Sequence, residues 1–188
     1  MPADFRQRLK QASQADHDRV DDLLSSFDIT TRQGFEGFLI IHKACFTTML
    51  GLAEPGTDTA SSLRAMLTRI DADLAVLGAS ARPPQSRPLP RTDAMALDYM
   101  IEGSRLGSRM LKRIWTGSRD PVVRAADAYF SMEPVPGRWK DICDALSVIP
   151  VQSTRAGAII EDTQRLFGMF QDVAIEMKTA QHPQEAIR

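Results

Sequence analysis

The sequence predicts an all-α protein, a single-domain bundle of about seven helices. Apolar residues recur every three or four positions through most of the chain, which is the period of an amphipathic helix. No segment alternates apolar and polar residues as a half-buried strand would. The 188 residues suffice for one domain with a substantial core. We assign residues 1–180 to this domain and 181–188 to a frayed C-terminal tail.

The first half of the chain is predicted to contain three helices. In the first, the apolar positions gather on one face: Leu9, Ala12, Val20, Leu23, Leu24 and Phe27. The stretch "TTRQGF" begins the second, with Thr30 as the expected N-cap and Gln33 three residues later, the spacing of a capping box. A third helix is indicated by a stripe of large apolar side chains: Leu63, Met66, Leu67, Ile70, Leu74 and Leu77.

An extended connection and four further helices follow. "GASARPPQSRPLPR" is rich in Pro, Arg and Ser, which is typical of an extended segment. A long helix is expected over residues 92–115, closed by Gly117. Asp120 and Pro121 are an N-cap followed by proline at the first helical position. "RWKDICDAL" is a short helix, and the last helix covers residues 153–178.

Composition and charge indicate the compartment of the protein and the kinds of partner it lacks. The formal net charge is −1, so no global field attracts nucleic acid or an anionic membrane. Cys45 and Cys143 lie far apart and form no disulfide framework, which favours a reducing compartment. "MPADFRQRLK" lacks the apolar core of a signal peptide, and runs such as "FLII" are too short to cross a bilayer. We therefore expect a cytoplasmic protein without nucleic-acid or membrane partners.

The three histidines differ in what they can do. His182 lies in the expected tail, and His42 falls within the apolar arc of the second helix, which indicates a buried core residue. His17 borders the apolar stripe of its helix and shares a ridge with Lys10 and Asp21. A carboxylate at i+4 can accept the Nδ1 proton and leave Nε2 free for a metal. Spacing alone favours the alternative, a solvated His–Asp surface pair.

Two glycines interrupt the long helix in "DYMIEGSRLGSRMLKRIW". Gly103 and Gly107 lie on one face, with Ser104 and Ser108 nearby, and each glycine costs about 0.5–1 kcal/mol against alanine. One interpretation is close packing of helices. The other is a bent helix whose bare backbone lies against a flat ligand. There is no zinc motif, and a single histidine with open coordination suits a haem iron better than a bare cation.

These segments, in their order along the chain, resemble the haem oxygenase family. "LKQASQADH" is similar to the first-helix motif of the family, which gives His17 the role of proximal iron ligand and Lys10 a contact with a haem propionate. Asp21 is similar to the acidic residue that orients the proximal imidazole. "PGRWKDICDAL" resembles a later helix whose basic residue, here Lys140, meets a propionate; a further basic residue of that helix is replaced by Asp144.

"MIEGSRLGSRMLKRI" resembles the distal helix of bacterial, phytochrome-associated haem oxygenases. The resemblance gives Gly103, Ser104 and Gly107 a catalytic role beside the haem, and makes the two glycines, with Tyr99 and Ser108, haem contacts. Two positions depart from the family pattern. Ser104 stands where animal members have the distal aspartate, and Ser108 replaces the second glycine of the usual pair.

The resemblance implies that haem is both cofactor and substrate. The family uses dioxygen to open the macrocycle to biliverdin, with release of iron and carbon monoxide. No flavin or nicotinamide motif is present, so the electrons come from an external reductase or ferredoxin, and a bilin-accepting phytochrome is a further partner. Three alternatives stay open: a non-enzymatic haem sensor or carrier, a thiamin-degrading type of enzyme that uses Cys45 or Cys143, and a plain interaction bundle.

Overall fold

The helix α2 (Arg32–Leu52) forms the centre of the molecule, and both α3 and α7 pack against it. The computed structural model describes residues 4–79, 84 and 87–181, and within them there are seven helices and no strand. In chain order the other helices are α1 (Phe5–Ser25), α3 (Asp58–Leu77), α4 (Ala94–Trp115), α5 (Pro121–Ala125), α6 (Arg138–Ser147) and α7 (Thr154–Gln181). The predicted all-α bundle is therefore confirmed.

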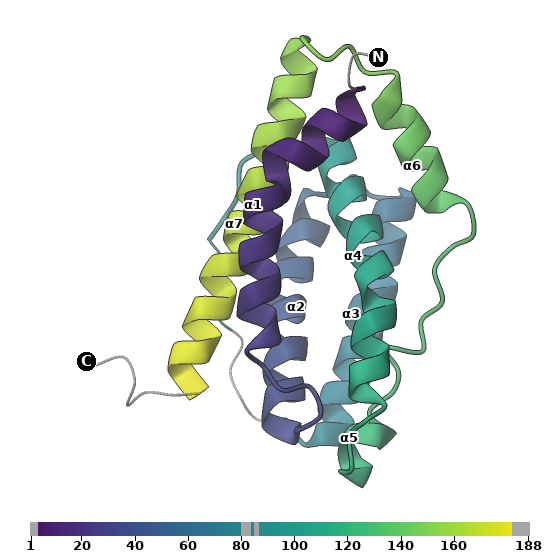
Figure 1. Cartoon of the computed structure of the whole chain (residues 1–188). Helices are drawn as coiled ribbons and strands as arrows, with labels where there is room; N and C mark the ends of the chain where they lie inside the picture. Colours follow the sequence, from purple (N-terminus) through teal and green to yellow (C-terminus); the bar gives the residue numbers. More distant parts are fainter. Residues whose placement is uncertain (1–3, 80–83, 85–86, 182–188) are drawn as a thin grey trace.

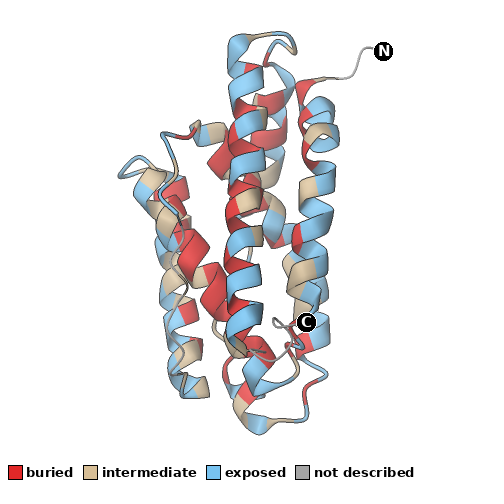
Figure 2. Ribbon diagram, turned by 90° about the vertical axis from the view of Figure 1, so that its left-hand side faces the viewer, coloured by how far each residue is buried: buried red, intermediate tan, exposed pale blue. Residues whose placement is uncertain are grey.

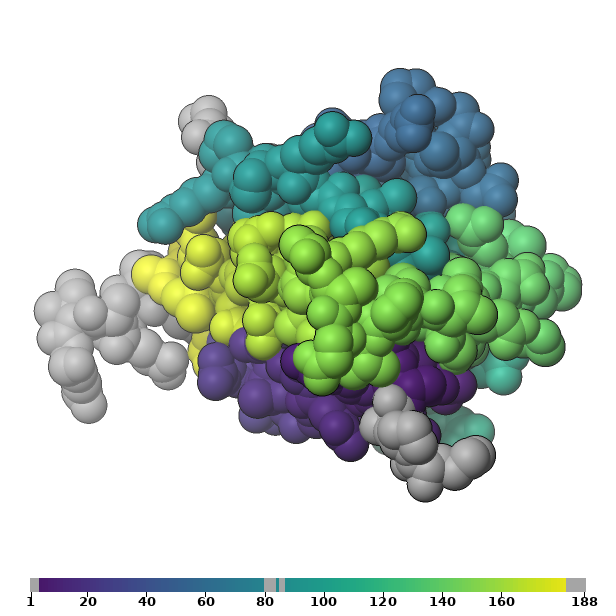
Figure 3. All heavy atoms as spheres, turned by 90° about the horizontal axis from the view of Figure 1, so that it is seen from above, coloured from purple at the N-terminus to yellow at the C-terminus, as the bar shows by residue number. Residues whose placement is uncertain are grey.

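Both α1 and α4 pack against the last helix, α7. The helix α1 lies along α7, whereas α4 packs against α7, α6 and α3. Figure 1 shows that α1 and α4 run in the same direction, from the end of the bundle that holds the N-terminus towards α5. Seen from above, α7 lies between α1 and the teal segment that leads into α4 (Figure 3). The buried positions face inward on every long helix (Figure 2).

The N-terminal caps confirm one prediction and correct another. Asp120 caps α5 by accepting from the N–H of Val122, with a proline next in the chain, as the sequence predicts. For α2 the cap is Thr31 and not Thr30, and its hydroxyl oxygen accepts from the N–H of Gly34. Thr30 is held outside the helix because its hydroxyl and its N–H both donate to the Asp28 carboxylate. The predicted capping box with Gln33 is therefore wrong.

The C-terminal ends also differ from expectation in detail. The helix α4 ends at Trp115, as predicted, but Gly117 does not close it in a left-handed conformation. The last turn is closed instead by the N–H groups of Thr116 and Gly117, which donate to carbonyls of the same turn. The predicted tail begins too early, because α7 continues to Gln181; residues 182–188, with His182, lie outside the described residues.

Aromatic side chains from distant parts of the chain meet on one side of α2. Phe35 stacks on Phe130 at a centroid distance of 5.7 Å, and Phe38 lies 6.1 Å from Tyr129. His42 is buried among these rings, with Phe38 at 4.1 Å. The prediction that His42 belongs to the core is confirmed. Aromatic pairs of this kind contribute about 0.5–1.5 kcal/mol each beyond the burial of their area.

The helix α2 is also long and apolar enough to cross a membrane by composition alone, with a mean hydropathy of 1.2 over its best window. Most of this stretch is buried inside the bundle, where an all-round apolar helix is the usual centre of a core.

We predict opposite effects for two glycine-to-alanine substitutions. A methyl group at Gly34 would overlap the backbone carbonyl of Asp28, which the cap geometry holds in place, so Gly34→Ala should lower the free energy of unfolding by at least about 2 kcal/mol. The control is Gly157→Ala in α7, where nothing lies within 4 Å of an added Cβ. It should raise stability by about 0.5 kcal/mol. Urea unfolding of both variants measures this; equal effects would contradict the assigned register of α2.

Candidate functional site

His17 lies on the exposed side of α1 with its Nδ1 facing two carboxylates. The side chain is 51% exposed, and Nδ1 lies 3.6 Å from Oδ1 of Asp18 and 3.4 Å from Oδ2 of Asp21. These distances are longer than a good direct hydrogen bond and suit an electrostatic or water-bridged contact. Both carboxylates favour a proton on Nδ1, which leaves the lone pair on Nε2. The predicted pairing of His17 with Asp21 is thus present, with Asp18 as a second acid.

The surroundings of His17 are partly apolar. The edge of its ring meets Phe167 of α7 at a centroid distance of 5.7 Å, in a T-shaped arrangement. Burial raises the pKa of the Asp21 carboxyl, and the nearby His17 opposes that rise. The histidine therefore stands at the border between the solvent and the apolar surface of α7.

The glycine-bearing part of α4 presents an exposed apolar face. Leu106, Met110 and Ile114 follow each other at intervals of four residues and are exposed, Met110 to 72%. Gly107 lies beside this stripe, and nothing lies within 4 Å of a Cβ added there. Such a Cβ at Gly103 would meet the ring of Trp139 at 3.6 Å, an ordinary contact. Gly107 therefore is not a site of close helix packing within the described chain, which weakens that interpretation of the glycine pair.

A hydrogen bond links the side chains of Ser13 in α1 and Tyr99 in α4 at one point where these two helices approach each other. Both helices run in the same direction (Figure 1). His17 and Gly103 each follow the bonded residue of their own helix by four positions, about one helical turn. The Ser13–Tyr99 contact therefore links the helix of His17 to the helix of Gly103, one turn before each of these residues. No sequence pattern points to Ser13, a small polar residue within an amphipathic helix.

Trp139 closes the upper end of the same region. Its ring lies 5.8 Å from that of Tyr99 and against Gly103. Its neighbour Arg138 fixes the start of α6, because its guanidinium binds Asp58 at 2.8 Å and Asp98 at 3.2 Å. This network is invisible in the sequence, since its three members come from three different helices.

The hydroxyl groups of the two serines of α4 donate within their own helix. The Ser104 hydroxyl donates to the carbonyl of Ile101 at 2.8 Å, and the Ser108 hydroxyl donates to that of Ser104 at 3.2 Å. Ser108 lines a cavity on another side of α4, away from the stripe that flanks Gly107. The four residues expected to contact one haem therefore do not share one face of α4. Gly103 and Gly107 lie on one face, whereas Ser108 faces the cavity on another.

The two lysines expected to meet propionates are both exposed. The Lys140 ammonium lies 2.5 Å from the Asp144 carboxylate one turn along α6, and this partner raises its pKa. A lysine whose charge is paired with a carboxylate attracts a haem propionate less strongly than an unpaired one. Lys10 has no such carboxylate partner among the described residues, so its positive charge is available at the surface of α1.

The other candidate groups of the sequence are buried and inert. Burial raises the pKa of both thiols, that of Cys45 well above its usual value, so neither is a ready thiolate nucleophile. His42 uses Nδ1 to bind the carbonyl of Phe38 at 2.8 Å, and burial lowers its pKa to about 4. Within residues 4–79, 84 and 87–181, no three His, Cys, Asp or Glu side chains gather as a metal site.

No protein-family model matches the sequence, and no curated protein is significantly similar to it.

His17, Gly103, Gly107 and the apolar stripe fit a haem group in their chemistry. One imidazole with its Nδ1 proton held by carboxylates can ligate a porphyrin iron, which needs no further protein ligand on that side. An exposed apolar helix face with a bare glycine can lie against a flat macrocycle. The poorest fit is at the propionates, where Lys140 is engaged by Asp144.

Protonation of His42 should destabilise the fold at mildly acidic pH. Because the pKa of His42 is about 4 in the folded chain and 6.5 when exposed, the unfolded state takes up the proton first as the pH falls. The fold therefore keeps its full stability above pH 6.5, where His42 is neutral in both states, and loses stability progressively as the pH falls from 6.5 towards 4. Between pH 7.5 and pH 5 this amounts to about 2 kcal/mol.

The measurement is urea unfolding of the wild type and of His42→Leu at both pH values. The wild type should lose about 2 kcal/mol more than the variant on acidification. An identical pH dependence in the two proteins would show that His42 titrates normally.

Proposed function

We propose that this protein is a haem oxygenase that binds haem between α1 and the glycine-bearing face of α4. The observation that carries the proposal is the placement of His17 and Gly103, each one helical turn beyond the Ser13–Tyr99 hydrogen bond. The resemblance of both segments to the proximal and distal helices of the family supports the same conclusion from the sequence. Haem would be substrate and cofactor at once, and iron would bind Nε2 of His17.

Each part of the site has a distinct task in this proposal. Asp18 and Asp21 hold the proton on Nδ1 of His17, so that Nε2 keeps its lone pair for the metal. Gly103 and Gly107 leave room for the macrocycle to approach the backbone of α4. The haem would cover the exposed apolar side chains of Leu106, Met110 and Ile114, and this contact would exclude water from one face of the haem. The positive charge of Lys10 attracts a propionate, a modest contribution near the surface.

Bound haem supplies the iron that activates dioxygen and the ring that is opened to biliverdin, with release of iron and carbon monoxide. The chain itself supplies orientation and water exclusion. Electrons would come from an external ferredoxin or reductase. A phytochrome that accepts the bilin is the partner that the family resemblance suggests, and a cytoplasmic location suits both partners.

One observation favours a second function, a non-enzymatic haem sensor or carrier. The hydroxyls of Ser104 and Ser108 both donate to carbonyls of their own helix, and neither residue supplies a carboxylate to organise water beside bound dioxygen. Haem binding and haem turnover must therefore be measured separately.

Haem binding is tested by removing the proposed ligand. His17→Ala should lose the Soret spectrum of a histidine-ligated haem and bind haem at least about tenfold more weakly, and added imidazole should restore the spectrum. The control is Gln11→Ala, an exposed residue on a different side of α1 from His17, which should behave as the wild type. An unchanged axial-histidine spectrum in His17→Ala would refute the assignment of the ligand.

Turnover is tested on the haem-loaded protein with a ferredoxin reducing system under oxygen. The enzyme should release biliverdin and carbon monoxide in equal amounts. Normal haem binding without either product would exclude the oxygenase and leave the sensor or carrier.

The face of α4 is tested with a bulky side chain at an open glycine. Gly107→Leu should leave the haem-free fold as stable as the wild type or more so, because nothing lies within 4 Å of the added Cβ and leucine favours helix by about 0.8 kcal/mol. Haem affinity should fall at least about tenfold, because leucine occupies the space of the ligand. The matched control is Gly157→Leu, at another open glycine in α7. Equal haem affinities for the two variants would place the haem elsewhere.

A further inference from the structure

Arg105 is a buried cation whose charge is not neutralised by an ion pair. The residue is 7% exposed, and one guanidinium nitrogen, Nη2, donates to the backbone carbonyl of Glu133. The other, Nη1, has no hydrogen-bond partner among the described residues. Glu102 on the same helix attracts it electrostatically but forms no ion pair with it. A buried charge without a close counter-ion is costly, so its retention calls for an explanation.

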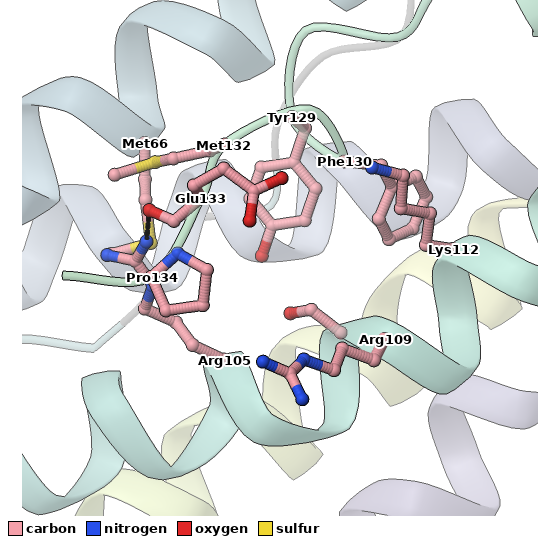
Figure 4. A pocket seen from close by; sticks show the side chains of 10 residues that line it. Met66, Arg105, Arg109, Lys112, Tyr129, Phe130, Met132, Glu133 and Pro134 are labelled. Atoms are coloured by element: carbon pink, nitrogen blue, oxygen red, sulfur yellow. Dashed lines mark hydrogen bonds between the residues drawn. The ribbon is translucent and has the colours of Figure 1, made fainter. Parts of the chain in front are cut away.

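Arg105 lines a cavity of about 210 Å³ between α4 and the segment that joins α5 to α6 (Figure 4). Arg109 and Lys112 follow it at the next two turns of α4 and line the same cavity. Neither has an ion-pair partner among residues 4–79, 84 and 87–181. The only carboxylate among the side chains lining this cavity is Glu133. Three cations and one carboxylate leave a formal charge of +2, so the cavity is electropositive.

The wall opposite α4 is rigidly held by α3. Asp73, which is 1% exposed, accepts from the N–H groups of Ala128 and Tyr129, both at 2.8 Å. Arg69 donates to the carbonyl of Ala128 at 3.0 Å. The ring of Phe130 is packed into the aromatic core beside α2. The cavity therefore has one fixed wall and one wall of cations.

The remaining lining groups indicate an organic ligand. Figure 4 shows the hydroxyl of Tyr129 pointing into the cavity, and burial raises the pKa of that hydroxyl beyond its usual range, so it stays a donor. Met66, Met132 and Pro134 add apolar surface. The volume is below the roughly 300–1,000 Å³ of pockets for drug-sized ligands. The ligand must therefore be small.

We propose that this cavity binds a small organic anion that carries a carboxylate or phosphate group. The guanidinium groups of Arg105 and Arg109 match the planar, two-pronged geometry of such oxyanions, and Lys112 adds a point charge. The anion would supply the hydrogen-bond partner that Nη1 of Arg105 lacks. The site lies on a different side of α4 from Gly107, so it is separate from the proposed haem face and does not depend on it.

The test uses the haem-free full chain with two probes, inorganic phosphate and citrate, which distinguish a phosphate from a carboxylate ligand. The thermal unfolding midpoint should rise with probe concentration and saturate, because a ligand that binds only the folded state stabilises it by mass action. Titration calorimetry should give the same dissociation constant. Saturation by either probe supports the proposal and names the group that is recognised.

The variants identify the cavity. Arg105→Met and Lys112→Gln should each weaken binding about tenfold or more, whereas Arg113→Gln, an exposed cation beside Lys112 that does not line the cavity, should bind as the wild type. Lys112→Gln keeps the test valid if Arg105→Met fails to fold. No saturable effect of either probe on the wild type, or an equal loss in Arg113→Gln, would overturn the proposal.

Discussion

The packing of aromatic rings against α2 is the constraint on which the rest of the molecule depends. Phe35 and Phe38 hold Phe130 and Tyr129, which belong to the segment that follows α5. Trp115, the last residue of α4, joins the same cluster, and its indole N–H donates to the carbonyl of Val123. One apolar cluster therefore fixes the lower end of α4, the short α5 and the chain beyond it.

This constraint gives α4 two unlike surfaces. Towards the segment after α5, Arg105 and its neighbours line a small electropositive cavity. On another side, Gly107 and Met110 stay open to solvent. A single helix thus carries the face proposed for haem and the site proposed for an anion.

The upper end of α4 is fixed by polar contacts. Arg138 ties the start of α6 to Asp98 of α4, and the adjacent Trp139 covers Tyr99 and Gly103. The Ser13–Tyr99 hydrogen bond then fixes α1 against the same helix. Apolar residues of the upper half of α4, such as Leu97 and Ile101, are buried as well, whereas Leu106 and Met110 further along the helix stay exposed. The candidate site is therefore a consequence of how α4 is anchored at its two ends.

The sequence by itself determined the elements, because a helix depends on contacts within a few residues. The apolar period predicted the helices, and Asp120 with Pro121 predicted the start of α5. The wrong prediction of the α2 cap has a local cause that the apolar period does not reveal. The Thr30 hydroxyl donates to the Asp28 carboxylate, and Thr31 caps the helix in its place. The sequence also singled out His17, whose acidic neighbour lies one turn away on its own helix.

Only the tertiary structure decided which of these residues meet. Whether Ser108 faces the glycine stripe or a cavity depends on what packs against α4, and that partner is the segment after α5. The buried charge of Arg105 gave no signal, since an arginine between two glycines resembles a solvated surface residue. The direction of a side chain on a helix follows from the sequence, but its burial follows from segments far away in the chain.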